Sequence, residues 1–361
     1  MRIGHGAARE PRAPRAPGRL WRRVLVGGAG ALLLGAVLGA ALWCRAALLL
    51  PADPGTTTAV LVDVQPGLGV RAIALLLQQR GVIRSAWAFD LLARHAGLTR
   101  ALQAGTYALQ PAMTPVAVLR VLASGETATV RVTIPEGYSG RQVIAALTAS
   151  GLGDAQGLAA GLQDASLLAA AGLPAPGPGA QTALEGFLYP ATYAFAPDEA
   201  ALALLARMLR QFSLVWTPAL AAEASANAGL DTLQAVTLAS IVQREVAQPA
   251  QMPLVAAVYL HRLRSGMDLD ADPTVLYALG VQGQQGPLTA TEQAVSSPYN
   301  TYRVAGLPPG PICNPGSAAL QAVAQPARTT ALYFLTAPDG SLVLADTLAE
   351  QEANLQTYLG G

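Results

Sequence analysis

The chain has 361 residues and a formal net charge of +1 at neutral pH. All of its basic residues are arginines, and eight of the 23 lie at or before Arg45. The remainder carries fifteen arginines against 21 acidic residues, a net charge of −6. With this excess of acidic residues no basic face is expected, and nucleic acid is therefore not expected as a partner. The two cysteines, Cys44 and Cys313, lie far apart, which excludes a disulfide framework.

The N-terminal region has the pattern of a membrane anchor. Residues 1–23 combine seven arginines with Pro, Ala and Gly, and are predicted to form a disordered basic arm. Residues 24–44 form the predicted transmembrane helix, because the first twenty of them carry no charge and suffice to cross a bilayer. The arginines before the span place the N-terminus in the cytoplasm. We therefore expect a single-pass protein of the plasma membrane, with its remaining domains outside the cell membrane.

A cleaved signal peptide is the alternative interpretation of this region, since it also combines a basic start with an apolar middle. The apolar stretch is longer than the core of a typical signal peptide, and no clear cleavage site precedes a polar start of a mature chain. The sequence favours an uncleaved anchor.

The part of the chain beyond the span is long enough for two domains and is predicted to have an α+β fold. Residues 45–125 have the order strand, helix, helix and strand, which indicates a small α+β module. Residues 126–182 are predicted to connect the domains through a strand, a helix from Ser139 and a linker rich in Pro, Gly and Ala at 169–182. Residues 183–361 are the predicted catalytic domain.

Residues 231–275 are predicted to form two helices followed by a turn. Asp231 and Gln234 stand three residues apart, the pattern of a capping box at a helix start. Apolar residues then recur with helical spacing as far as Val242. The first helix therefore presents a stripe that faces a core.

Glu245 is the next position on that stripe, three and four residues after Val242 and Ile241. At the edge of a core-facing stripe, partial desolvation would raise the pKa of this carboxyl and keep it protonated near neutrality. A general acid needs that property. The alternative is a solvated surface glutamate or an ion-pair partner of Arg244.

Three further stretches of the chain carry motifs. They are ALEGFLYPATYAF at 183–195, DPTV at 272–275 and SPYNTYRVAGLPPGPICNPG at 297–316. With LASIVQRE at 238–245 and the following PLVAAVYLHRLRSGMDLDADPTV run, they resemble the membrane-anchored endolytic murein (peptidoglycan) transglycosylases, the YceG-like family. The resemblance implies cleavage of peptidoglycan glycan strands between MurNAc and GlcNAc, leaving 1,6-anhydro-MurNAc ends. It also implies that residues 45–125 are similar to a LysM domain, a glycan-binding fold, with a simple spacer as the alternative.

Aromatic residues alternate in the 183–195 stretch after a Glu-Gly turn. Aromatic faces stack on sugar rings, and a tyrosine hydroxyl can form a hydrogen bond with a ring substituent. Glu185 and Tyr193 are therefore candidate substrate-binding residues. Packing of the aromatic side chains into a core is the alternative, above all for Phe187 and Phe195.

Asp268, Asp270 and Asp272 alternate as in a calcium loop, but Pro273 stands where such a loop requires Gly. Neither a metal ion nor a cofactor is expected. Asp272 is predicted to be the N-cap of a helix with Pro273 at its first position. The resemblance implies that this corner, including Thr274, lies close to the active cleft.

The 297–316 stretch is rich in proline. Such a loop loses little entropy on ordering and can hold polar groups rigidly. Tyr299, Asn300, Tyr302 and Asn314 are the candidate substrate contacts, since amide groups suit N-acetyl and hydroxyl substituents. The alternative is a structural loop that crosses a helix bundle, and the resemblance favours a wall of the substrate site.

The expected mechanism uses one carboxyl. Ordinary glycosidases use two, whereas a lytic transglycosylase needs one because the C6 hydroxyl of the sugar attacks C1. Glu245 is expected to protonate the glycosidic oxygen and then to take the proton of the C6 hydroxyl. Two alternatives remain open: a hydrolytic muramidase with a second carboxylate such as Asp272 or Glu185, and a non-catalytic glycan-binding scaffold. The expected partners are peptidoglycan glycan strands and cell-wall synthases such as penicillin-binding proteins.

The chain departs from the family's pattern at two places. Gln243 stands where the family commonly has an acid, two positions before the catalytic one, which falls on Glu245. Near the C-terminus, Leu342, Leu344 and Gln351 stand where the family usually carries a His and an aromatic before the final helix and another His within it. The last segment is still predicted to be a helix.

Overall fold

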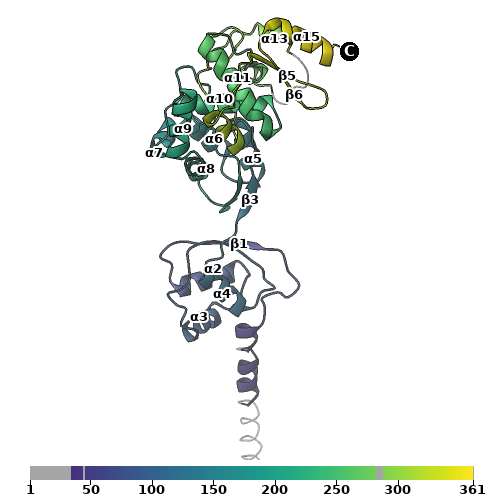
Figure 1. Ribbon diagram of the computed structural model, residues 1–361. Helices are drawn as coiled ribbons and strands as arrows, with labels where there is room; N and C mark the ends of the chain where they lie inside the picture. The colour runs from purple at the N-terminus through teal and green to yellow at the C-terminus, as the bar shows by residue number, and fades with distance from the viewer. Residues whose placement is uncertain (1–33, 44, 282–287, 361) are drawn as a thin grey trace, which may run out of the picture. The chain divides into compact units, whose positions relative to one another are not determined.

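The computed structural model describes residues 34–43, 45–281 and 288–360. The predicted basic arm and most of the predicted membrane span therefore lie outside the described residues. Residues 34–43 and 45–49 are helical, and no helix in the described part of the chain is long and apolar enough to cross a membrane. The chain divides into two compact units, between Ala128 and Thr129 (Figure 1).

The first unit packs helices against a two-stranded antiparallel sheet. Its elements from Val60 onward are β1 (Val60–Val64), α2 (Val70–Gln79), α3 (Ala86–His95), β2 (Gly105–Leu109) and α4 (Pro115–Ser124). Val62 lies opposite Tyr107 across the sheet, and both side chains are fully buried. Alternate residues of each strand thus face a core that belongs to this unit alone. The predicted order of strand, helix, helix and strand is confirmed, and α4 follows it.

The second unit is mainly helical, with two small antiparallel sheets, β3–β4 and β5–β6, in the residues that the structure describes. Its elements are β3 (Val130–Thr133), α5 (Gly140–Ala149), α6 (Ala155–Leu162), α7 (Ala165–Ala170), β4 (Thr192–Phe195), α8 (Ala201–Val215), α9 (Pro218–Ala228), α10 (Thr232–Glu245), the short 3-10 helix η1 (Pro249–Gln251), α11 (Met252–Ser265), α12 (Asp272–Leu279), α13 (Ala290–Gln293), α14 (Ser317–Ala324), β5 (Tyr333–Thr336), β6 (Leu342–Ala345) and α15 (Leu348–Tyr358). Mixed α and β elements were predicted, and the final helix is present.

Residues 129–182 share the core of the second unit. Strand β3 lies in the predicted connecting segment and pairs with β4 in the predicted catalytic part, where Val132 lies opposite Tyr193. Side chains from both segments, such as Leu147 and Phe187, belong to one continuous apolar cluster. The structure thus places this segment in the same compact unit as the residues that follow it.

Helix α10 is the central helix of this unit. The predicted capping box is present: the Asp231 carboxylate accepts from the Gln234 amide at 2.9 Å, and the Gln234 side chain accepts from the Asp231 amide at 3.0 Å. Residues 235–242 are all buried, because α9, α11, α12 and α14 pack around them. The helix ends at Glu245, and Val246 is extended. Glu245 therefore lies in the last turn of α10, just beyond the buried stretch of the helix.

Candidate active site

The carboxyl of Glu245 lies between α10 and α11. Its Oε1 accepts a hydrogen bond of 2.7 Å from the hydroxyl of Tyr259. Burial is the largest cause of a pKa raised from the ordinary 4.5 to about 7. The charge of Asp272 also raises this pKa, whereas the Tyr259 hydrogen bond and the charge of Arg262 lower it. The carboxyl can therefore both hold and release a proton near neutral pH.

Glu245 lines a cavity of about 380 Å³. The cavity is formed by α10, α11, the turn before α12, the loop after α13, β5 and α15. Its lining residues are Glu245, Tyr259, Arg262, Leu269, Asp270, Asp272, Tyr302, Tyr333, Phe334, Leu335, Gln351 and Leu355. Aromatic rings supply flat faces of the kind on which sugar rings stack, and the carboxyl and hydroxyl groups supply hydrogen-bond partners.

Arg262 holds two walls of this cavity together. Its Nε donates to the backbone carbonyl of Leu332 at 2.7 Å, just before β5. Its Nη1 donates to the carbonyl of Leu269 at 2.9 Å and to the carboxylate of Asp270 at 3.1 Å. The guanidinium also lies 5.0 Å from the ring centre of Tyr333. This buried side chain thus fixes the turn before α12 against β5.

The prediction that Asp272 is a helix N-cap is wrong. Helix α12 begins at Asp272, Ala271 occupies the N-cap position, and no side chain caps the helix. The carboxylate of Asp272 instead accepts a hydrogen bond from the Tyr302 hydroxyl. The Asp272 carboxylate therefore bonds to a hydroxyl of the neighbouring loop, whereas the carboxylate of an N-cap would accept from a backbone amide of its own helix. Asp272 and Tyr302 both line the cavity with Glu245.

Thr274 lies beneath this corner and is fully buried. Its hydroxyl donates to the carbonyl of Ala271 at 2.7 Å and lies 2.9 Å from the hydroxyl of Thr301. The Thr301 hydroxyl in turn accepts from the amide of Ala271 at 3.0 Å. Thr274 therefore ties the start of α12 to the loop that carries Tyr302.

Asn300 is also fully buried, next to Tyr302. Its side-chain amide donates to the carbonyls of Gln293 and Val295, both at 2.8 Å, and its oxygen accepts from the Tyr302 amide at 3.0 Å. All the groups that could contact a sugar are thus used to shape the loop. Asn300 orients the backbone of Tyr302 and does not line the cavity.

Asn314 and Tyr299 likewise hold chain segments together. The fully buried Asn314 accepts from the amide of Leu188 and donates to the carbonyl of Tyr138, both at 2.8 Å. The buried Tyr299 accepts from the amide of Gln181 at 3.3 Å. Neither residue lines the cavity around Glu245.

Glu185 is buried elsewhere in the second unit and is only 2% exposed. It accepts hydrogen bonds from the Gly140 amide at the start of α5 (2.8 Å), from the Tyr277 hydroxyl (3.0 Å) and from the Thr182 hydroxyl (3.4 Å). Burial raises the pKa of Glu185 to about 7, although these hydrogen bonds lower it. The carboxyl joins three segments and does not line the cavity around Glu245.

Tyr193 lies on β4, away from the Glu245 cavity. Its ring stacks on Phe195 with centres 5.2 Å apart, and its hydroxyl donates to the carbonyl of Tyr189. It lines a different cavity together with Arg207. Of the eight predicted substrate contacts, the structure therefore brings only Asp272 and Tyr302 to the cavity of Glu245.

Sequence reasoning gave no role to Tyr259, Arg262 or Tyr333. Tyr259 and Arg262 stand three residues apart just after the apolar run at 252–258, and a polar pair with that spacing on a core-facing helix is a usable signal. Gln351 was noted only as a departure, yet it lines the cavity: its Nε2 donates to the Phe334 carbonyl at 3.1 Å. Its Oε1 is buried and has no partner in the described part of the chain.

The other departures lie outside the cavity. The side-chain oxygen of Gln243 accepts from the amide of Gly316 at 2.8 Å, so this position ties α10 to the start of α14. Leu342 and Leu344 lie on β6, where Leu344 is opposite Phe334. Strand β6 pairs with β5, whose residues Tyr333, Phe334 and Leu335 line the cavity.

A carboxyl with a raised pKa in a cavity is a candidate for acid–base catalysis, and the aromatic walls of this cavity suit a sugar-like ligand. The sequence pattern of the YceG-like family matches residues 62–357, and the chain belongs to this family.

Relatives and a solved structure agree with this assignment. The endolytic murein transglycosylase of Bacillus subtilis is 30% identical over 90% of this chain and 91% of its own length. The endolytic murein transglycosylase of Streptococcus pneumoniae is 30% identical over 86% of this chain, which spans 60% of that protein. The crystal structure of a YceG-like protein from Listeria monocytogenes has a TM-score of 0.57 at 30% identity, covering 82% of this chain and 99% of that one.

Proposed function

We propose that this protein is an endolytic lytic transglycosylase that cleaves peptidoglycan glycan strands between MurNAc and GlcNAc. The observation that carries the proposal is the Glu245 carboxyl, with a pKa of about 7, in an aromatic cavity of about 380 Å³. A general acid works best when its pKa lies near the operating pH. The similarity to two endolytic murein transglycosylases supports the same reaction.

In the proposed mechanism Glu245 acts twice. It first donates its proton to the glycosidic oxygen, so that the bond from C1 to this oxygen breaks and GlcNAc leaves with a new hydroxyl. The C6 hydroxyl oxygen of the same MurNAc then forms a bond to C1, and its proton passes to the Glu245 carboxylate. The product carries a 1,6-anhydro ring, and the enzyme regains its protonated carboxyl. Tyr259 holds Oε1 at 2.7 Å and so leaves the other oxygen for the substrate.

Asp272 and Tyr302 line the proposed sugar site together with Glu245. The hydrogen bond from Tyr302 fixes the carboxylate of Asp272, and the Asp272 charge helps to keep the proton on Glu245. The Oε1 atom of Gln351 is an acceptor without a protein partner among the described residues, and it suits the N–H of an N-acetyl group.

A hydrolytic muramidase is the second candidate, because Asp272 lies in the same cavity as Glu245. Two carboxyls on one sugar site are the usual equipment of a glycosidase that activates water. Product chemistry separates the two reactions, since a hydrolase leaves reducing ends and a lytic transglycosylase leaves anhydro ends.

The cellular setting is part of the proposal. The uncharged stretch at residues 24–43 supports a single-pass anchor in the plasma membrane with a cytoplasmic N-terminus. Residues 45–125 act as a LysM-like module that holds the glycan strand. Cell-wall synthases such as penicillin-binding proteins are the proposed protein partners, because nascent strands are the proposed substrate.

Mass spectrometry of glycans released from purified peptidoglycan tests the reaction. The protein is compared with Glu245→Gln, which keeps the shape of the side chain and removes the acid. We expect anhydro-ended products from the parent and none from the variant. Reducing-end products would identify a hydrolase, and retained strand binding without products from either protein would identify a scaffold.

A further inference from the structure

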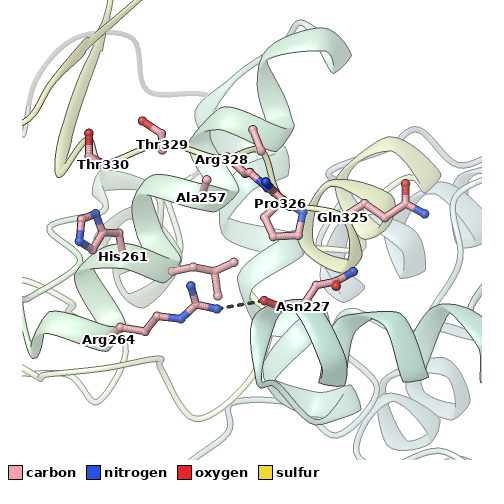
Figure 2. Close-up of a pocket in the computed structure, with 11 residues that line it drawn as sticks. Asn227, Ala257, His261, Arg264, Gln325, Pro326, Arg328, Thr329 and Thr330 are labelled. Carbon is pink, nitrogen blue, oxygen red and sulfur yellow. Dashed lines mark hydrogen bonds between the residues drawn. The ribbon is translucent and has the colours of Figure 1, made fainter.

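A second cavity, of about 660 Å³, lies beside α11 (Figure 2). Helix α11 contributes Tyr259 and Arg262 to the Glu245 cavity, whereas His261 and Arg264 line the second cavity. At about 100° per residue, these two pairs project from opposite faces of the helix. The lining residues are Asn227, Ala257, Leu260, His261, Arg264, Gln325, Pro326, Ala327, Arg328, Thr329 and Thr330.

The charged side chains that line this cavity are all positive. Its lining includes two arginines and a histidine, and no described Asp or Glu is among the lining residues. Two carboxylates bond to lining residues without lining the cavity themselves: Glu223 accepts from the Gln325 side chain at 2.7 Å, and Asp346 accepts from the Thr330 hydroxyl at 3.1 Å. Because the charged side chains in the lining itself are arginines, an anionic group is the favoured occupant.

Arg264 is held in place for such a group. Its Nη2 donates to the backbone carbonyl of Asn227 at 3.0 Å (Figure 2) and to that of Ala228 at 3.4 Å, at the end of α9. Arg264 and Arg328 are both exposed, and no other hydrogen bond joins either guanidinium to a described residue, so their remaining N–H groups are free to bind a ligand. Arginine binds carboxylates through two parallel hydrogen bonds, and an arginine that is already oriented loses less entropy when it does so.

The remaining polar atoms divide into a donor set and an acceptor set. The Thr329 oxygen accepts from the Ala331 amide at 3.1 Å, which leaves its proton free to donate. The side-chain nitrogens of Asn227 and Gln325 are engaged by Ala324 and Glu223, which leaves their oxygens free to accept. A ligand with a carboxylate and amide N–H groups matches both sets.

His261 adds a further unsatisfied group. Neither of its ring nitrogens forms a hydrogen bond to a described residue, and Nδ1 is buried. A buried polar atom without a partner is rare in proteins, and one that lines a cavity indicates a missing ligand or water.

We propose that this cavity binds a peptide with free carboxylates, held by Arg264 and Arg328. Peptidoglycan carries such peptides on its MurNAc residues, so the proposal names a second point of substrate recognition. The identification of the peptide's source rests on the proposed function, whereas binding of the isolated peptide does not.

Titration calorimetry of the full-length protein with a synthetic stem peptide, L-Ala-γ-D-Glu-L-Lys-D-Ala, tests the proposal. The comparison ligand is the same peptide with its carboxyls amidated. We expect the free peptide to bind about tenfold more tightly than the amide, because a hydrogen bond to a charged group contributes about that factor. Arg328→Gln should weaken binding of the free peptide to a similar extent, whereas Arg210→Gln, an exposed arginine on α8, should not.

Several outcomes would overturn the proposal. The first two are equal affinity for the two peptides and no saturable binding up to millimolar concentration. The others are an Arg328→Gln variant that binds the free peptide as tightly as the parent, and tighter binding of inorganic phosphate than of the peptide. Glu245→Gln should bind the peptide like the parent, so a failure of the proposed cleavage reaction does not affect this measurement. On glycan strands, Arg328→Gln should raise KM for strands that keep their peptides and leave it unchanged for strands from which an amidase has removed them.

Discussion

The hydroxyl of Tyr259 lowers the pH at which Glu245 loses its proton, and Tyr259→Phe tests this directly. The hydroxyl donates to Oε1 at 2.7 Å and stabilises the ionised carboxylate, so it lowers the pKa of Glu245 against the effect of burial. A hydrogen bond to a charged group is worth about 1.5–3 kcal/mol. A protonated carboxyl keeps part of that bond, and 1.36 kcal/mol corresponds to one pKa unit. Removal of the hydroxyl should therefore raise the pKa from about 7 by about one unit.

The alkaline limb of kcat/KM reports this pKa in the free enzyme. The rate of release of soluble glycan from purified peptidoglycan is measured between pH 5 and about pH 10 for the parent and for Tyr259→Phe. We expect the midpoint of the alkaline limb to move up by about one pH unit. Tyr333→Phe is the matched control, since it removes a hydroxyl from the same cavity that has no bond to Glu245. A midpoint that stays in place or moves down in Tyr259→Phe would refute the role of this bond.

Three further substitutions test other parts of the site. Asp272→Asn removes a charge that raises the pKa of Glu245, so the alkaline limb should move to lower pH in the same assay; a shift to higher pH would contradict this. Arg262→Lys removes the guanidinium whose two nitrogens bond to the turn before α12 and to the residue before β5. It should lower the free energy of unfolding by about 3 kcal/mol in urea denaturation and reduce kcat/KM. The folded-state pKa of Glu185, about 7, lies above its ordinary value of 4.5. The stability that the protonated Glu185 contributes is therefore present below pH 4.5 and is lost as the pH rises to about 7, a loss of about 3 kcal/mol. Denaturation of Glu185→Gln at pH 5 and pH 8 should show a smaller fall than the parent, and an equal fall would show that Glu185 is not the source.

The local parts of this fold could be predicted from the sequence because their causes are local. The capping box of Asp231 and Gln234 and the apolar run to Val242 lie within one helix, and the structure has both. The end of that helix placed Glu245 at the edge of a core, which was enough to predict the raised pKa. The N-cap prediction for Asp272 failed because Tyr302, thirty residues away, binds the carboxylate.

The long-range parts could not be predicted, since several segments must meet before the roles of their side chains are decided. Asn300 and Asn314 were expected to contact sugar because their amides stand in a rigid loop. Buried backbone groups must first be satisfied, and these amides do so: Asn300 bonds to groups beside it in the chain, and Asn314 bonds to Tyr138 and Leu188 in other segments. Glu185 follows the same logic, because its carboxyl meets the amide of Gly140 at the start of a helix 45 residues earlier in the chain.

The substitution at Gln351 bears on how the site handles protons. The resemblance implies that relatives usually carry a histidine in the final helix where this chain has Gln351, and an imidazole there would titrate near neutral pH beside Glu245. Glutamine does not titrate, and no histidine is among the described residues that line this cavity. The ionisation of Glu245 therefore remains the main proton-dependent event expected near pH 7 in the cavity. A single alkaline inflection that moves with substitutions at Tyr259 and Asp272 is the signature of this arrangement, since both residues act on the same carboxyl.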